Sequence, residues 1–296
     1  MGKQVNSRSQ MQDSTAPAAA PPAPGPVDKA MEVLSALSET GAPHRLADLA
    51  RHTGLAKPTV HRLLRTLAAQ GFAEPAEQGS YRAGPRLLGL AARVLADDAA
   101  LDLARPALAE LRTRTGLFAS YAVRDDRTLV HLEVLAPAQG LGLDLRPGSR
   151  EPLTAGGAGL ALLAALPPDE AERLLAGTDS PHADEATHAD EATHADETPH
   201  VHEAVSAALA ETARRGYGFD SADIWRDRRT LAAAVRDSAG LPVGTLALTG
   251  LAFTLDETAA ELYGPMVRAA AGAVSAGLAA RTGTRLGVVG SGGEAR

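Results

Sequence analysis

The 296-residue chain contains no cysteine. Disulfide bonds, thiolate zinc sites and cysteine redox centres are therefore excluded, which fits a reducing compartment. Aromatic residues make up only 3% of the chain, so there is little material for a surface that binds nucleic acid by base stacking. Hydrophobic residues still account for 45%, with many Ala, Leu and Val. This composition predicts a globular protein with an aliphatic core.

Long apolar runs and a secretory signal are also missing. The longest apolar run, about Gly156–Leu166, is well short of the ~20 residues that span a bilayer. Residues 1–26 lack the continuous apolar stretch of a signal peptide. We therefore expect a soluble cytoplasmic protein without a membrane partner.

Basic charge is concentrated in one segment of an acidic chain. The net charge of −7 argues against a protein that coats nucleic acid with its whole surface. Residues 45–70 nevertheless hold a run of Lys and Arg side chains against the single acid Asp48. This local excess indicates one segment that contacts nucleic acid. Its members are Arg45, Arg51, Lys57, Arg62 and Arg65.

The length suffices for two domains, because single cores usually stop growing near this size. The Pro-rich residues 1–26 predict a disordered tail. Residues 27–84 then combine three helices with helical apolar spacing and a short β-hairpin around a Gln78-Gly79 turn. The helices run from Asp28 towards Gly41, over Leu46–His52, and from Pro58 to Gly71, with Gly54 in the intervening turn.

Residues 85–282 predict a connector and a second domain. A helical linker over 85–100, with a break near Asp97-Asp98, leads into a domain over 101–282. Strands and helices alternate there, so we expect an α+β domain with a central antiparallel sheet; residues 283–296 are expected to be a flexible tail. Strands are predicted at Phe118–Val123, Leu129–Leu135, Thr230–Val235 and Val243–Leu248, and helices at Leu101–Arg114, Ala155–Leu166, Pro168–Leu175, Val201–Arg215 and Asp256–Ala280.

Within the segment 179–200, a hexad occurs three times, as HADEAT twice and then HADETP. Six residues turn a helix through about 600°, which leaves successive histidines roughly 120° apart. One helix therefore cannot bring them together on a metal ion. The charge-rich, apolar-poor composition favours a solvated loop, and we expect no metal and no cofactor.

The third helix has the pattern of a DNA-recognition helix. Its apolar residues bury one side, while the other side carries basic and hydroxyl side chains with no intervening acid. Lys and Arg neutralise phosphates, and Thr, His or Arg side chains reach base edges from a helix in the major groove. A basic helix face alone is often only a solvated surface, but the order of helix, turn, helix and hairpin favours DNA binding. We expect contacts from Arg45, Lys57, Thr59, His61, Arg62 and Arg65.

The chain resembles the IclR family of bacterial transcriptional regulators. The stretches DKAMEVLSAL, LADLARHTGLAKPTVHRLLRTLAAQGF and YRAGPRLLGLA resemble the family's DNA-binding region. PLTAGGAGLALLAALP, RRGYGFDSAD and LAAAVRDSAGLPVGTLALTG extend the resemblance over about residues 27–280.

This resemblance implies a second domain related to the GAF fold, in which a small metabolite, expected to be an organic acid, alters binding to double-stranded operator DNA. Leu160 stands where the family commonly has lysine, and Trp225 falls in a segment that departs from the family pattern. Trp225 either lines an unusual pocket or is a packed aromatic residue. The effector positions implied by the resemblance are Gly157, Ala158, Asp220, Thr230, Ala247 and Thr249.

We further expect a homodimer or homotetramer whose paired heads read a pseudo-palindromic operator, and whose placement the effector biases through the connector. Two alternatives remain at this point. An enzyme would need the fold to bring together an acid–base set such as His131, Glu133 and Asp144. A DNA-associated protein without ligand control would bind DNA whatever metabolite is added.

Overall fold

The computed structural model describes residues 24–39, 43–138, 142–176, 198–220 and 228–288. The predicted tail up to residue 23, the hexads up to residue 197, Gly41, Trp225 and residues 289–296 lie outside these ranges. The chain divides into two compact units, Met1–Val94 and Leu95–Arg296.

Three helices form the core of the first unit. They are α1 (Pro26–Ser38), α2 (Leu46–His52) and α3 (Lys57–Ala69). Gly54 has a φ of +64° in the turn between α2 and α3, a left-handed conformation that glycine adopts at little cost. The predicted amphipathic stripes face one another in a buried cluster. It includes Val33, Leu37, Leu49, Val60, Leu64 and Leu67.

A three-stranded sheet closes the first unit and supplies the wing. The predicted hairpin is confirmed as β2 (Ala73–Pro75) and β3 (Ser80–Ala83), joined by the 3₁₀ turn η1 (Glu77–Gly79). Gln78 and Gly79 both have positive φ at its tip. A further strand, β1 (His44–Arg45), pairs with β3 on the other side. This strand was not predicted, because a segment of two residues is too short to show the alternation of apolar and polar residues that indicates a strand.

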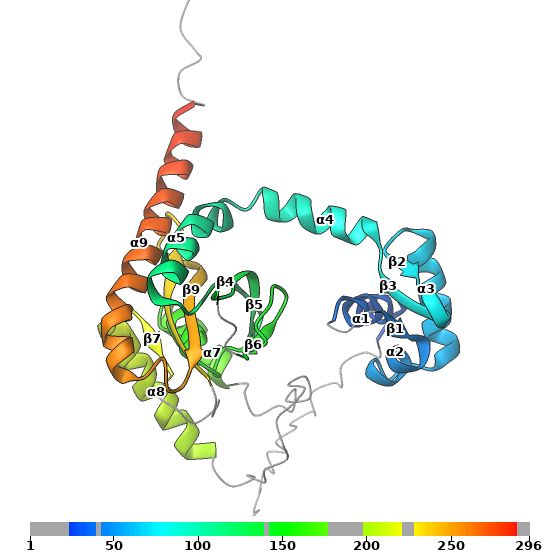
Figure 1. Ribbon diagram of the computed structural model, residues 1–296, viewed down its shortest axis with the longest axis horizontal. Helices are drawn as coiled ribbons and strands as arrows, with labels where there is room; N and C mark the ends of the chain where they lie inside the picture. The colour runs from blue at the N-terminus through cyan, green and yellow to red at the C-terminus, as the bar shows by residue number, and fades with distance from the viewer. Residues whose placement is uncertain (1–23, 40–42, 139–141, 177–197, 221–227, 289–296) are drawn as a thin grey trace, which may run out of the picture. The chain divides into compact units, whose positions relative to one another are not determined.

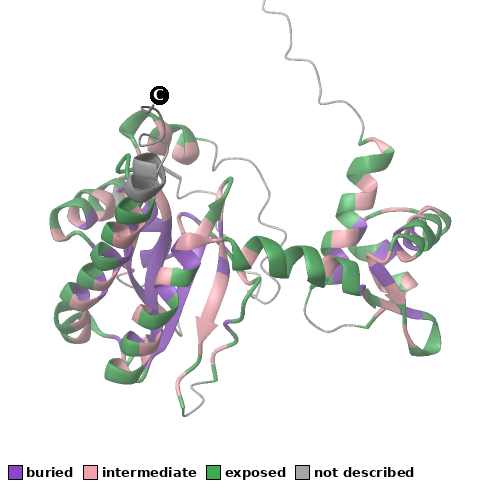
Figure 2. Cartoon of the chain, turned by 90° about the horizontal axis from the view of Figure 1, so that it is seen from above, coloured by how far each residue is buried: buried purple, intermediate pink, exposed green. Residues whose placement is uncertain are grey.

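The connector consists of two helices, α4 (Pro85–Ala96) and α5 (Ala99–Thr115). The predicted break is confirmed, because the Asp98 side chain caps α5 by accepting a hydrogen bond from the Leu101 N–H at 2.9 Å. The boundary between the two units falls within α4. No residue of α4 is buried, and Leu88, Leu90 and Val94 are exposed on it (Figure 2).

An antiparallel sheet forms the centre of the second unit, as expected for the α+β class. Its strand order is β6-β5-β4-β9-β8-β7. Every neighbouring pair is antiparallel. The short edge strands β6 and β7 were not predicted. The strands are β4 (Phe118–Asp125), β5 (Thr128–Leu135), β6 (Arg150–Pro152), β7 (Gly218–Phe219), β8 (Arg228–Arg236) and β9 (Pro242–Leu251).

Helices pack against both faces of this sheet (Figure 1). α5 and α9 (Glu257–Val288) cover one face and enclose the larger core, which includes Leu108, Tyr121 and Leu248. α6 (Gly157–Leu163) packs on the other face, with α7 (Pro168–Ala176) and α8 (Thr198–Arg215) beside it. We refer to these as the α9 face and the α6 face of the sheet.

Several helix boundaries differ from the prediction. α6 spans only Gly157–Leu163 instead of Ala155–Leu166, because Ala155 is held in a turn by a hydrogen bond from its N–H to the Pro152 carbonyl. α8 begins at Thr198 instead of Val201, and α9 continues beyond Ala280 to Val288. No helix in the described ranges is long and apolar enough to cross a membrane.

Candidate nucleic-acid interface and ligand site

The solvent side of α3 carries unpaired basic side chains. Lys57, His61, Arg62 and Arg65 are exposed, and Thr59 is half-buried. At 100° per residue, Lys57, His61 and Arg65 form a row along the helix, and Arg62 lies next to that row. No acidic side chain in the described ranges forms an ion pair with any of them. This face is therefore free to meet an anionic partner.

Arg45 approaches the wing through β1. It pairs with Ser80 of β3, so its exposed side chain belongs to the winged sheet. Other arginines of this unit are already engaged, among them Arg82, which pairs with Glu74 at 3.1 Å. Arg51 pairs with Asp48 at 2.7 Å. Arg86 donates to the Gln70 carbonyl at 3.1 Å and lies over a phenyl ring. Their positive charge is thus partly committed within the unit.

A hollow of about 430 Å³ lies against α1 and α2 in the same unit. Its polar side chains pair with each other on the surface, Asp48 with Arg51 at 2.7 Å and Glu39 with His52 at 3.0 Å. Surface ion pairs of this kind contribute little energy. The described residues that line the hollow offer no buried polar group to a ligand.

The α6 face of the sheet gathers polar side chains in a buried place. Cross-strand partners point to the same face, and Thr230 pairs with Thr249 while Ala232 and Ser120 both flank Ala247. The Thr230 and Thr249 hydroxyls lie 3.3 Å apart. The Ser120 hydroxyl is buried and has no hydrogen-bond partner in the described part of the chain. The sequence prediction included Thr230, Ala247 and Thr249 but missed Ser120.

Two charged side chains from distant strands also meet over this face. Arg228 of β8 donates to Glu151 of β6 at 2.7 Å, although β5, β4 and β9 lie between those strands in the sheet. The two ends of the sheet therefore curl toward each other. His131 is buried, with Nε2 3.6 Å from a Glu151 oxygen. Burial opposes ionisation of Glu151, but His131 and Arg228 outweigh it and hold the pKa of Glu151 below its usual range.

Asp220 adds a carboxylate to this site, directly after β7. Its Oδ1 accepts a hydrogen bond from the Thr230 N–H at 2.6 Å. Its Oδ2 is buried without a hydrogen-bond partner among the described residues. Burial raises the pKa of Asp220 to about 7, opposed by backbone hydrogen bonds and by Arg228 and reinforced by the charge of Glu151.

The glycines before α6 bring that helix against the sheet. A Cβ on Gly157 would lie 2.1 Å from the Thr230 carbonyl oxygen, and one on Gly156 would lie 3.3 Å from Asp220 Oδ2. Gly157 is therefore required for close packing of α6 on β8, a physical reason that differs from the predicted approach of a ligand. Ala158 belongs to the same buried cluster. Leu160, the residue that stands where the family commonly has lysine, is also buried.

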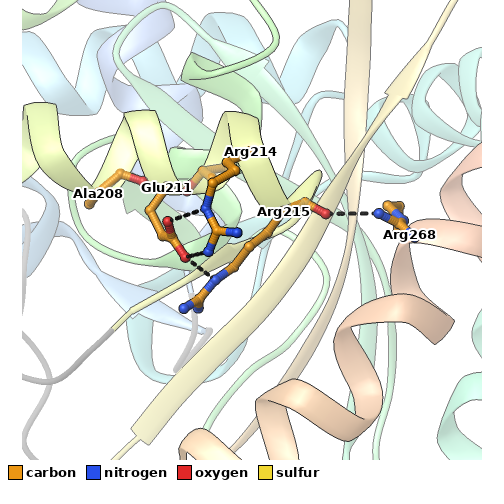
Figure 3. A network of polar contacts seen from close by, with 6 residues as sticks. Ala208, Glu211, Arg214, Arg215 and Arg268 are labelled. Carbon is orange, nitrogen blue, oxygen red and sulfur yellow. Dashed lines mark hydrogen bonds and ion pairs between the residues drawn. The ribbon is translucent and has the colours of Figure 1, made fainter.

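A polar network fixes the end of α8, from which the chain enters β7 (Figure 3). Glu211 pairs with Arg214, at 2.8 Å from Nε, and with Arg215. Arg268 of α9 donates to the Arg215 carbonyl at 3.0 Å. Gly216 follows with a φ of +75°. Of these contacts, the bond from Arg268 links the end of α8 to α9, shortly before the segment that carries Asp220.

The candidate acid–base set of His131, Glu133 and Asp144 is not assembled. His131 faces Glu151 on the α6 face, whereas Glu133 pairs with Arg105 of α5 at 3.0 Å on the α9 face. An irregularity in the β4–β5 register separates the two, since a bulge reverses the alternation of side chains. Asp144 forms a separate, exposed ion pair with Arg146.

A winged helix-turn-helix with an unpaired basic face, on a chain with a separate α+β unit, defines a DNA-binding transcriptional regulator. Residues 26–77 match the IclR helix-turn-helix domain, and residues 93–276 match the family "Bacterial transcriptional regulator IclR C-terminal". The chain belongs to the IclR family of transcriptional regulators, as the sequence resemblance predicted.

Similar proteins are regulators by name. The transcriptional repressor IclR of Escherichia coli is 28% identical over 84% of this chain and 89% of its own length. The glycerol operon regulatory protein of Streptomyces coelicolor is 30% identical over 69% of this chain and 76% of its own. An IclR homologue from Microbacterium hydrocarbonoxydans, solved with 4-hydroxybenzoate, has a TM-score of 0.66 and 22% identity, covering 86% of this chain and 100% of its own.

Proposed function

We propose that this regulator binds operator DNA through α3 and the wing, and that a small organic acid bound on the α6 face of the sheet modulates that binding. The observation that supports the ligand site is a group of buried polar atoms that have no hydrogen-bond partner among the described residues, Ser120 Oγ and Asp220 Oδ2, beside the Thr230–Thr249 hydroxyls. Unpaired buried polar atoms are costly. A polar ligand that bonds with them would remove that cost.

The proposed ligand site includes the positions implied by the family resemblance. Asp220, Thr230 and Thr249 supply polar atoms, Gly157 and Ala158 form its helical wall, and Ala247 lies on its floor. Ser120 and the Glu151–Arg228 pair extend it. The structural relative solved with 4-hydroxybenzoate supports an acid of that kind as a first probe.

On DNA, we propose that α3 enters the major groove while the wing lies along the backbone. Lys57, Arg62 and Arg65 neutralise phosphates, and Thr59 and His61 are the candidates for base contacts. Arg45, at the edge of the winged sheet, contacts a neighbouring phosphate.

We also propose a symmetric oligomer in which two heads read two half-sites. The exposed apolar residues Leu88, Leu90 and Val94 make α4 a candidate for contact with a second copy of the chain. α5 contacts the sheet on its α9 face and directly follows α4 in the chain. A ligand-dependent shift of the sheet would then reach the connector.

The test is an anisotropy titration of the purified chain against promoter DNA from the region beside its own gene, at several salt concentrations and with a panel of small carboxylic acids. We expect site-specific binding at nanomolar protein that one acid weakens or strengthens by tenfold or more. Site-specific binding that no acid changes would favour a DNA-associated protein without ligand control. Weak binding with a steep salt dependence and no preferred site would reject the operator assignment.

A further inference from the structure

The charges around Asp220 are unfavourable for an anionic ligand. Among the described residues, the charged groups that face it are Glu151 of β6 and Arg228 of β8. These two pair with each other at 2.7 Å, so the guanidinium charge of Arg228 is already balanced by a carboxylate. His131 of β5 lies behind Glu151. α6 carries no titratable side chain, and β9 contributes only hydroxyl and apolar side chains here.

A small carboxylate that enters this site meets Asp220 Oδ2, which has no hydrogen-bond partner among the described residues. When Asp220 is ionised, this oxygen can only accept a hydrogen bond, and so can the ligand carboxylate. Two ionised carboxylates at hydrogen-bond distance repel each other strongly in a buried place, and one proton shared between them removes the repulsion. Asp220 is suited to hold that proton, since its Oδ1 is fixed by the Thr230 N–H while its Oδ2 remains without a partner in the described ranges.

We propose that a small carboxylate effector is taken up together with one proton, which Asp220 Oδ2 holds and donates to the effector carboxylate. Asp220 is therefore a specificity-determining residue: protonated, it accepts an acid, and ionised, it rejects one. No bond is made or broken except the O–H bond at Asp220, and the proton comes from solvent. The inference rests on the proposed effector site and adds the protonation state in which that site binds.

The expected size of the effect follows from the pKa of about 7 for Asp220. Only the protonated fraction binds the acid, so the apparent Kd rises about tenfold between pH 6 and pH 8. A neutral ligand of the same shape gains nothing from the proton and shows no such dependence.

Isothermal titration calorimetry of the full chain at pH 6 and pH 8 tests this, with 4-hydroxybenzoate as the acid probe and methyl 4-hydroxybenzoate as its neutral counterpart. Repeating the acid titration in two buffers of different ionisation enthalpy counts the protons taken up. We expect an uptake of close to one proton per bound acid at pH 8.

Asp220→Asn should bind the acid equally at both pH values, because its amide is a donor at any pH. Asp144→Asn, which alters an exposed carboxylate of the same unit, should behave as the unchanged chain.

Carboxyl ¹³C NMR of aspartate-labelled chain gives a second readout that needs no ligand, with the Asp220 signal assigned by its loss in Asp220→Asn. A titration midpoint between pH 6 and pH 8 is expected, and a midpoint below pH 5 would overturn the proposal. Acid binding of equal strength at both pH values would also overturn it while leaving ligand control of DNA binding intact. If no acid binds at either pH, the proposal that this site takes a carboxylate ligand is rejected. The operator titration would still decide whether another metabolite regulates the chain.

Discussion

Arg62 lies on the solvent side of α3, and no acidic partner engages it within the described part of the chain. Its guanidinium is therefore available to a phosphate. Arg62→Ala should lower operator affinity about tenfold and reduce the slope of log K against log salt by roughly 1, because one phosphate contact and its released counterion are lost.

The measurement is fluorescence anisotropy over a salt series, with circular dichroism to verify that the variant is folded. Arg114→Ala is the matched control, since it removes the same charge from an exposed pair with Glu110 in the second unit. Unchanged affinity and slope in Arg62→Ala would reject α3 as the recognition helix.

Asp220 should also make the stability of the protein depend on pH. Its folded pKa of about 7 is above the ordinary value of 3.8, so the folded state binds more protons than the unfolded state between those values. Stability contributed by the protonated carboxyl is therefore lost as the pH rises from 4 to 7. Asp220→Asn should be more stable than the unchanged chain at pH 8 by roughly 2 to 4 kcal/mol, and about equal at pH 3.5.

Urea unfolding at both pH values, followed by circular dichroism, measures this difference. An equal change in stability at the two pH values would mean that the pKa of Asp220 is not raised in the folded state. A variant destabilised more at pH 8 than at pH 3.5 would mean that the ionised carboxylate stabilises the fold, contrary to the burial of Oδ2.

At the scale of elements, the packing of α6 on the sheet depends on the absence of a side chain at Gly157. A Cβ there would lie 2.1 Å from the Thr230 carbonyl oxygen and 2.8 Å from the Gly218 carbonyl oxygen. Both are backbone atoms that cannot move without shifting a strand. Gly157→Ala should therefore destabilise the protein by about 3 kcal/mol or more.

Gly272→Ala is the control for this change. Gly272 lies in the interior of α9, where a Cβ would have no neighbour within 4 Å among the described residues. Alanine in an exposed helix position should stabilise the protein by roughly 0.5 to 1 kcal/mol. Thermal unfolding of the two variants should thus give shifts of opposite sign, and a stabilised Gly157→Ala would contradict the close approach of α6 to β8.

At the scale of the whole molecule, the proposed symmetric pairing makes a prediction about operator geometry. Two heads related by a twofold axis require half-sites separated by one helical turn or a multiple of it. Inserting five base pairs between half-sites should reduce affinity more than inserting ten, because five place the second half-site on the opposite side of the duplex.

Anisotropy on three duplexes (the original operator, the operator with five inserted base pairs and the operator with ten) tests this prediction, combined with sedimentation of the protein–DNA complex. Equal affinity for all three duplexes, with one chain bound to one half-site, would remove the paired-head model. Leu88→Ser with Val94→Ser, on the exposed apolar side of α4, should weaken the oligomer if α4 contributes to it.

The local parts of the fold could be predicted from the sequence because their signals lie within a few neighbouring residues. The stripes of α1, α2 and α3 repeat at helical spacing, and the hairpin is marked by Gln78-Gly79. The break between α4 and α5 is set by Asp98, which caps the next helix. The same stretches were sufficient to predict the family.

The tertiary structure decided which distant residues meet. Arg228 and Glu151 come from strands separated by three others in the sheet, and only the curl of that sheet brings them together. His131 and Glu133 are two residues apart, a spacing that places side chains on the same face of a regular strand. The register irregularity between them places these two side chains on opposite faces. The sequence by itself thus determined the helix-turn-helix, the wing and the class of regulator, since these depend on local periodicity. The burial and charge of the ligand site depend on long-range strand pairing, which no local pattern encodes.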